Sequence, residues 1–300
     1  MDDMQQPGPS DATTRSLTLP DGRVLTWTEC GDPTGRPLLY CHGFPSCGRE
    51  ALFADAAARA LGIRVLAPDR PGYAAAASQP GRRITDWPLE ALAILDALAV
   101  TRAPVLGVSG GAPYALACAA HAPGRFGPVA TAGGLGPLTT NADAHGMSAL
   151  SRLSIRLARR GSPLLAGLFH LLAAVIRRQP RLMFALLAGS APPRDRDVFR
   201  DRELRGTWQA ALQAAVCNGA AGAIGELRLY TRPWGFDLDR VTVPVDVWHG
   251  GLDTVVPPAH GQRLAAALPN ATYRGCPEDG HFSLPIRWID GILERLIDGE

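Results

Sequence analysis

The sequence predicts an α/β fold with a mostly parallel central sheet of about eight strands, flanked by helices and interrupted by one helical insertion. Short apolar runs alternate with helix-like runs from residue 15 to about residue 131, as in parallel sheets whose strands are joined by helices. The strand signal then disappears for about a hundred residues and returns at Val241. A chain of 300 residues is long enough for one main core with one insertion.

The first half of the predicted sheet begins with a hairpin. Residues 15–29 contain two strand-like runs joined by the turn Pro20-Asp21-Gly22. Buried strands are then expected at 37–41, 63–67 and 103–108, with an alanine-rich helix at 111–122. Right-handed crossovers between these strands would build a parallel sheet.

The insertion and the C-terminal part complete the predicted architecture. Leu-, Ala- and Arg-rich helical patterns predict a helical cap over residues 137–236, within a core formed by 15–136 and 237–300. In the second part of the core we expect strands at 243–249 and 271–274 and helices at 259–268 and 286–297. The polar segment 1–14 is predicted to be disordered.

The segment Gly107-Val108-Ser109-Gly110-Gly111 lies between the strand at 103–108 and the following helix. A G-x-S-x-G pentapeptide at a strand-to-helix turn describes a nucleophile elbow, in which small residues let the backbone turn sharply and expose the serine. The pentapeptide also arises by chance in Gly- and Ser-rich chains, so its position carries the argument. It predicts a catalytic nucleophile at Ser109.

Two later loops supply partners for this serine. Asp253 follows the strand at 243–249, and His281 lies in a loop before the terminal helix, which gives the chain order serine, aspartate, histidine. His281 would accept the serine proton, and Asp253 would orient the imidazole and stabilise the imidazolium. Asp246 lies within the predicted strand and Asp279 is too close to His281 in sequence, so we prefer Asp253 as the acid.

With these residues in this order, the chain resembles α/β-hydrolases that have a serine nucleophile and a helical cap. The resemblance includes His42-Gly43-Phe44-Pro45, where that family places its oxyanion loop, and Asp69-Arg70-Pro71-Gly72-Tyr73, which is similar to the family's D-R-x-G turn. It implies the α/β-hydrolase fold, with an oxyanion hole formed by the backbone N–H groups of Phe44 and Gly110. The chain departs from the family at 74–78, where alanines replace a glycine-containing stretch.

Four further side chains are candidates for the substrate pocket. These candidates are His42, Tyr73, His170 and Trp208. His42 also has a structural interpretation, as the residue that anchors the oxyanion loop. His145 and Tyr230 could also contact substrate from the cap, although residues of these types more often serve simple packing.

The cap has an uneven charge distribution. Residues 144–194 contain eight arginines and no acidic residue, and they include the apolar run 163–176. That run contains His170 and is shorter than the roughly twenty residues needed to span a bilayer, so we expect a helix that lines an apolar pocket. Contact with an anionic membrane surface and a homodimer interface remain alternatives. The leucine-rich helices predict a small apolar acyl or aromatic substrate.

Composition argues against several other functions. A net charge of +2, without a basic run interleaved with aromatics, argues against a nucleic-acid partner. The absence of lysine excludes a Schiff-base or Walker-type lysine. Six cysteines without metal-ligand spacing indicate reduced thiols, and no metal or cofactor is implied. The polar N-terminus has no signal-peptide pattern, so a cytoplasmic location is expected.

These observations predict a serine hydrolase that cleaves an ester, lactone or thioester through an acyl-enzyme. Ser109 argues against the haloalkane dehalogenases and epoxide hydrolases of this fold, which carry aspartate at the elbow, and the HGFP loop differs from the H-G-G-P-G pattern of prolyl iminopeptidases. The same triad also serves carbon–carbon bond hydrolases of the meta-cleavage type and acyltransferases. A non-hydrolytic cyclase or isomerase, or a ligand-binding receptor, is the alternative of another class.

Overall fold

The computed structural model describes residues 13–299 and contains an eight-stranded sheet in the order β1-β2-β4-β3-β5-β6-β7-β8. Its strands are β1 (Thr13–Thr18), β2 (Val24–Gly31), β3 (Arg36–Cys41), β4 (Ile63–Pro68), β5 (Ala103–Val108), β6 (Phe126–Ala132), β7 (Val245–Gly250) and β8 (Ala271–Cys276). The hairpin of β1 and β2 is antiparallel, β2 joins β4 antiparallel, and all other pairs are parallel. This confirms the predicted mostly parallel sheet.

The N-terminal segment 1–14, predicted to be disordered, lies only partly within the described residues. Residues 1–12 of the segment predicted to be disordered lie outside the described residues. That prediction included Thr13 and Thr14, which are instead the first residues of β1. Thr13 pairs with Glu29, and Thr14 pairs with Thr28. The prediction is wrong for these two residues, because backbone pairing with β2 extends the hairpin beyond its apolar part.

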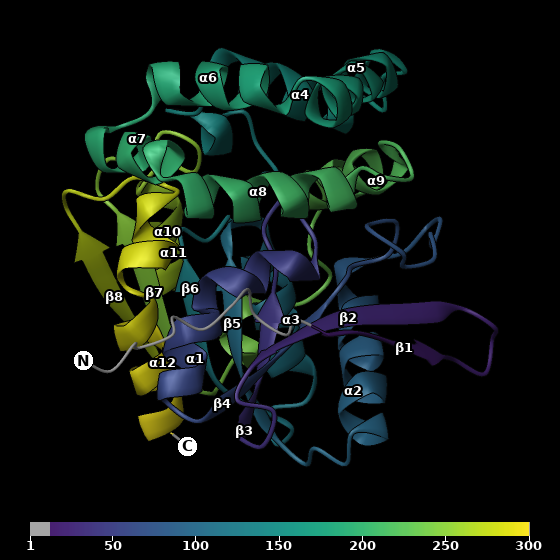
Figure 1. The fold of residues 1–300 in the computed structure, drawn as a ribbon, viewed down its shortest axis with the longest axis vertical. Helices are drawn as coiled ribbons and strands as arrows, with labels where there is room; N and C mark the ends of the chain where they lie inside the picture. Colours follow the sequence, from purple (N-terminus) through teal and green to yellow (C-terminus); the bar gives the residue numbers. More distant parts are fainter. Residues whose placement is uncertain (1–12, 300) are drawn as a thin grey trace, which may run out of the picture.

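Helices cover both faces of the sheet (Figure 1). The core helices are α1 (Asp55–Ala60), α2 (Trp87–Ala97), α3 (Ala112–His121), α10 (Ala259–Ala267), α11 (Ser283–Arg287) and α12 (Ile289–Asp298), with short 3-10 helices η1 (Gly48–Ala54), η2 (Ile84–Asp86), η3 (Ser109–Gly111) and η5 (Leu238–Arg240). Alternate residues of β3 enter separate apolar clusters: Leu38 packs in the cluster that includes α12, and Leu39 packs in the cluster that includes α3. Both strand faces are therefore buried.

The predicted single closing helix is broken. The chain leaves helical geometry at Trp288, where ψ is 8°, and α11 and α12 lie on either side of this residue. The Trp288 indole N–H donates to Asp279 Oδ2 at 2.9 Å, and the ring packs on Trp248 with centroids 5.6 Å apart. These contacts hold the residue at the break, a tertiary effect that helical periodicity does not reveal.

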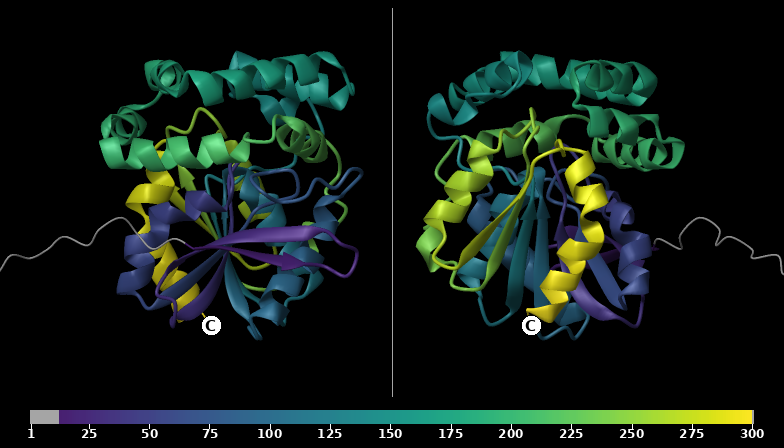
Figure 2. Two further views of the ribbon diagram at one scale, coloured as in Figure 1. Left: turned by 45° about the vertical axis from the view of Figure 1, so that its right-hand side comes forward. Right: turned by 90° about the vertical axis from the view of Figure 1, so that its left-hand side faces the viewer.

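Between β6 and β7 the described chain forms η4 (Ala142–Ala144) and six α-helices inside the predicted insertion. These are α4 (Ala149–Arg159), α5 (Leu164–Arg178), α6 (Pro180–Ser190), α7 (Pro193–Arg200), α8 (Arg202–Ala215) and α9 (Ala221–Tyr230). Figures 1 and 2 show that α4, α5 and α6 form an outer layer, while α8 and α9 lie between that layer and the core. The insertion therefore covers one edge of the sheet.

The longest cap helix, α5, has 15 residues. Within residues 13–299, no helix combines the length and apolar character that crossing a bilayer would require.

Candidate active site

Ser109 occupies a strained turn directly after the central strand β5. It is the first residue of η3, its φ is +51°, and only 8% of its surface is exposed. A left-handed conformation is costly for a residue with a side chain and is kept where surrounding structure enforces it. The turn places the hydroxyl beside the N-terminal end of α3, where backbone N–H groups favour developing negative charge.

The structure brings the three predicted triad residues together. The Ser109 hydroxyl donates to His281 Nε2 at 3.0 Å, and His281 Nδ1–H donates to Asp253 Oδ2 at 2.7 Å. These residues follow β5, β8 and β7, whose parallel carboxyl ends meet at one edge of the sheet. The continuous hydrogen-bond chain from hydroxyl to carboxylate is the arrangement that activates a serine.

The second carboxylate oxygen of Asp253 is held by the turn that follows it. Asp253 Oδ1 accepts the backbone N–H groups of Val255 at 2.9 Å and Val256 at 2.8 Å. His249 donates from Nε2 to the Val256 carbonyl at 2.8 Å, and burial lowers the pKa of its imidazole. His249 therefore supports this turn as a neutral, buried side chain.

The electrostatic surroundings of His281 favour its protonated form. Burial lowers the pKa of this imidazole, but nearby carboxylates, above all Asp253 through its charge and hydrogen bond, together raise it by more, so its pKa lies above the ordinary value. Asp195 and Glu50 act in the same direction. His281 is thus suited to take a proton from Ser109 and to hold it while charge develops on a substrate.

Asp195, on cap helix α7, is a site residue that the sequence reasoning missed. Its buried carboxylate accepts the backbone N–H groups of His281 at 2.9 Å, Phe282 at 3.2 Å and Ser283 at 2.8 Å. A Cβ at Gly280 would lie 2.4 Å from Asp195 Oδ2, so only glycine allows this approach. The signal available was that Asp195 is the first acidic residue after the acid-free stretch 144–194.

The two predicted oxyanion donors lie in loops that touch each other. A Cβ at Gly110 would lie 2.7 Å from Phe44 Cβ and 2.6 Å from the Tyr230 hydroxyl. Gly110 is the second residue of η3, a position whose N–H has no acceptor inside a helix. Within residues 13–299, the Phe44 N–H likewise has no hydrogen-bond acceptor. Both donors therefore remain available beside Ser109.

His42 is a buried residue that contacts the oxyanion loop and Arg70. It is fully buried, donates from Nδ1 to the Gly43 carbonyl at 2.9 Å and accepts the Arg70 N–H on Nε2 at 3.2 Å. Burial and the nearby Arg70 charge hold its pKa well below the usual value. Its structural interpretation fits this geometry, and its place in a substrate pocket stays a prediction.

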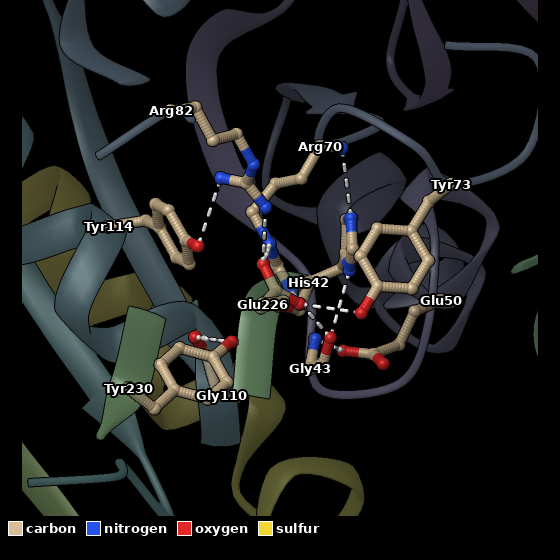
Figure 3. Close-up of polar contacts among 10 residues, drawn as sticks. All are labelled: His42, Gly43, Glu50, Arg70, Tyr73, Arg82, Gly110, Tyr114, Glu226 and Tyr230. Carbon is tan, nitrogen blue, oxygen red and sulfur yellow. Dashed lines mark hydrogen bonds and ion pairs between the residues drawn. The ribbon is translucent and has the colours of Figure 1, made fainter. Parts of the chain in front are cut away.

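Tyr73 belongs to a buried charged cluster, drawn in Figure 3. Arg70 and Glu226 form an ion pair with no exposed surface, at 2.6 Å between Nε and Oε1. The Tyr73 hydroxyl donates to Glu226 Oε2 at 2.8 Å, and Arg82 bonds both Glu226 and the Tyr114 hydroxyl. The Tyr73 hydroxyl is therefore held by the Glu226 carboxylate from the cap, and the place of Tyr73 in a substrate pocket stays a prediction.

Two neighbouring residues of cap helix α5 lie on opposite faces of that helix. His170 is exposed on α5, while its neighbour Phe169 is buried and packs against Phe44 with ring centroids 6.2 Å apart. The inward residues of α5 recur every three or four positions, and His170 is out of phase with them. Its place in a substrate pocket stays a prediction, and Phe169 is the inward-facing residue that the periodicity could have identified.

Three other aromatic or cap candidates have clear positions. Trp208 is buried on α8 and packs against Phe282, the neighbour of His281, with centroids 5.3 Å apart. The Tyr230 hydroxyl donates to the Gly110 carbonyl at 2.8 Å, and His145 is exposed. Trp208 and Tyr230 thus lie beside the site, whereas His145 does not.

Comparison with known proteins gives the family. The model of the alpha/beta hydrolase fold family matches residues 36–286. A dihydrolipoyllysine-residue acetyltransferase component of an acetoin cleaving system from Pseudomonas putida is 29% identical over 93% of this chain. The chain spans only 66% of that relative's length. Rhodomycin D methylesterase DauP from Streptomyces sp. strain C5 is 29% identical over 91% of this chain and 93% of its own.

Solved structures agree on the fold. An esterase from Exiguobacterium antarcticum, EaEST, has a TM-score of 0.70 at 17% identity, over 94% of this chain and 97% of that one. The fold and family expected from the sequence are therefore confirmed, and the chain belongs to the alpha/beta hydrolase fold family.

Proposed function

We propose that this protein is a serine hydrolase that cleaves an ester, lactone or thioester of a small apolar molecule. The observation that carries the proposal is the hydrogen-bond chain from Ser109 through His281 to Asp253, with distances of 3.0 and 2.7 Å. The names of similar proteins, which include a methylesterase and an esterase, support ester hydrolysis.

In the first half of the reaction, His281 Nε2 takes the Ser109 proton while Oγ attacks the carbonyl carbon. The carbonyl oxygen gains negative charge in the tetrahedral intermediate, and the N–H groups of Phe44 and Gly110 stabilise it. The intermediate collapses when His281 protonates the leaving alcohol or thiol. The acyl group remains bonded to Ser109.

In the second half, His281 takes a proton from water, and the hydroxide formed attacks the acyl-enzyme carbonyl. Collapse of the second tetrahedral intermediate releases the acid and returns the proton to Ser109. Asp253 stays ionised throughout and holds the imidazole in the tautomer with its proton on Nδ1. Transfer to an acceptor other than water would use the same acyl-enzyme, so product analysis distinguishes hydrolysis from acyl transfer.

Aromatic side chains around the site support an apolar substrate. Phe44 packs against Phe169 from the cap, and Phe282 packs against Trp208. Such rings favour apolar acyl or aromatic groups through burial of their surfaces. Equal turnover of short polar and long apolar esters would remove support for this preference.

The test is hydrolysis of a chain-length series of p-nitrophenyl esters at neutral pH. Wild type is compared with Ser109→Ala, and with Ser16→Ala as a control at an exposed serine of β1. We expect Ser109→Ala to lower kcat by about 10⁴-fold or more, because no nucleophile remains, and Ser16→Ala to leave it unchanged. Equal activity of wild type and Ser109→Ala would refute the proposed function.

A further inference from the structure

Cap helix α9 reaches into the core beside the oxyanion loop. Its Glu226 is fully buried, although carboxylates are rarely buried without a specific partner. Glu226 binds Arg70 in a bidentate way, with Nε to Oε1 at 2.6 Å and Nη2 to Oε2 at 2.9 Å. Because the guanidinium is planar and rigid, two parallel bonds fix its orientation as well as its position.

The other side of the same guanidinium holds the oxyanion loop (Figure 3). Arg70 Nη2 donates to the Gly43 carbonyl at 2.7 Å, and Nη1 donates to the His42 carbonyl. The Gly43 carbonyl also accepts from His42 Nδ1 at 2.9 Å. Two donors therefore fix the direction of this single carbonyl oxygen.

The Gly43 carbonyl and the Phe44 N–H belong to one peptide unit. Because a trans peptide is planar, its N–H points opposite to its carbonyl, so a donor that fixes the Gly43 oxygen also aims the Phe44 N–H. A positive charge on the carbonyl side also polarises the amide and strengthens its N–H as a donor. Arg70 can thus affect both the direction and the strength of this oxyanion donor.

The Gly110 donor is held differently. Its N–H shares a peptide with the Ser109 carbonyl, which accepts the Leu135 N–H at 3.0 Å. Tyr230, four residues after Glu226 on α9, donates to the next carbonyl, that of Gly110, at 2.8 Å. Of the two oxyanion donors, it is therefore Phe44 whose peptide depends on the cap carboxylate.

We propose that Arg70 and Glu226 are positioning residues for the oxyanion hole: the cap carboxylate orients the guanidinium that aims the Phe44 N–H at the substrate oxygen. This inference rests on the proposed function, because it assigns a role in stabilising its tetrahedral intermediate. It makes the cap part of the catalytic arrangement and not only a cover. Glu226 stays ionised at neutral pH: burial raises its pKa, but the charge and hydrogen bonds of Arg70, together with the charge of Arg82, outweigh burial and lower the pKa to about 2.

The same contacts would be present if Arg70 and Glu226 only joined the cap to the core. The test therefore needs a measurement that reports on the active site of folded molecules and does not depend on how much protein is folded. We choose the second-order rate of Ser109 labelling by a fluorophosphonate, whose phosphoryl oxygen gains negative charge in the oxyanion hole. A second readout is the ratio of kcat/KM for an ester and its thionoester. Sulfur is a weaker hydrogen-bond acceptor than oxygen, so misplaced donors lower this ratio, whereas a loss of folded protein leaves it unchanged.

Two variants and one control carry the test. Glu226→Gln removes the charge that holds Arg70, and Arg70→Lys keeps the charge but loses the planar fork. The control, Glu90→Gln, removes a buried carboxylate that pairs with Arg23 away from the site. We expect about a tenfold slower labelling for both test variants, a lower ester-to-thionoester ratio and little change in KM, with Glu90→Gln within about twofold of wild type. Displacing a donor should cost less than the roughly 10²–10³-fold cost of deleting one.

The outcomes separate this inference from the proposed function. Labelling of wild type, with unchanged rates and ratios in folded Glu226→Gln or Arg70→Lys, would overturn the positioning role and leave the hydrolase intact. No labelling of wild type would overturn both. If one variant does not fold, the result of the other decides. If neither folds while Glu90→Gln does, Arg70 and Glu226 serve only to join the cap to the core, and the inference is overturned.

Discussion

The two sides of the site are held in different ways. Ser109 and Asp253 are fixed by neighbouring segments of the core: the turn between β5 and α3 holds the serine, and two N–H groups of the following turn hold the aspartate. The His281 loop is instead held directly by a buried carboxylate of cap helix α7. The oxyanion loop is held by Arg70, which is bound in turn by a buried carboxylate of cap helix α9. The proposed nucleophile and acid are therefore held by segments of the core alone, whereas the proposed base and one proposed oxyanion donor depend on contacts between cap and core.

This difference has a consequence for variants. Substitution of Ser109 or Asp253 should abolish catalysis while leaving the fold and the cap in place. Substitution of the buried carboxylates of α7 or α9 should leave Ser109 in place. It should, however, misalign groups that must act together within a fraction of an ångström. The largest losses of rate are therefore expected from substitutions on the core side. Substitutions on the cap side should cause intermediate losses of rate together with a loss of stability.

After Ser109→Ala, the largest expected effect is that of Asp253→Asn. An asparagine retains the size of the side chain, but it favours the wrong imidazole tautomer and does not stabilise the imidazolium, so kcat should fall by about 10⁴-fold. Initial rates with the best p-nitrophenyl ester provide the measurement. The control is Asp246→Asn, a β7 carboxylate paired with Arg274 and Arg295, which should change kcat by less than about threefold.

The pH profile of the same two proteins sharpens this prediction. His281 must be neutral to act as a base, and its pKa is raised, so wild-type kcat/KM should be lost as pH falls through a value above about 6.5. In Asp253→Asn, burial still lowers the His281 pKa but the carboxylate charge is gone, so the acid limb should move to lower pH. An unmoved limb would argue against Asp253 as the partner of His281.

On the cap side we expect a smaller loss with Asp195→Asn. The amide retains one acceptor oxygen but presents an NH₂ group to backbone N–H groups, so the His281 loop should shift. We expect kcat to fall about 10- to 100-fold and the free energy of unfolding to fall by about 2 kcal/mol, measured by ester hydrolysis and urea unfolding. Asp197→Asn, on the same helix but exposed, is the matched control. Unchanged kcat in Asp195→Asn would show that the loop keeps its geometry without the cap.

The positions of Ser109, Asp253 and His281 could be predicted from the sequence because their signals are local. The strand before Ser109, the small residues around it and the positions of Asp253 and His281 after apolar strands all follow from short patterns. Parallel strands bring their carboxyl ends to one edge, so the chain order alone placed the three residues together. No knowledge of the cap was needed for this step.

The cap side could not be predicted, because its contacts join distant residues. Asp195 binds the N–H of a residue 86 positions away, and Glu226 binds Arg70 across 156 positions. Neither carboxylate belongs to a short motif. His42 and Tyr73 were expected in the pocket on residue type alone, but the fold turns both toward Arg70 and Glu226. Their roles depend on partners that only the folded chain brings near.

The smallest expected effects on catalysis lie within α5, where Phe169 faces the inside of the cap and the next residue, His170, faces outward. Phe169→Ala removes a buried ring that packs on Phe44, so the free energy of unfolding should fall by about 3 kcal/mol and the preference for longer acyl chains should weaken. His170→Ala, at an exposed position, should stay within about 0.5 kcal/mol of wild type with an unchanged chain-length profile. Urea unfolding and the p-nitrophenyl ester series measure both. A larger effect at His170 than at Phe169 would mean that α5 presents its other face to the substrate, and the apolar surroundings assigned to the site would have to be redrawn around that face.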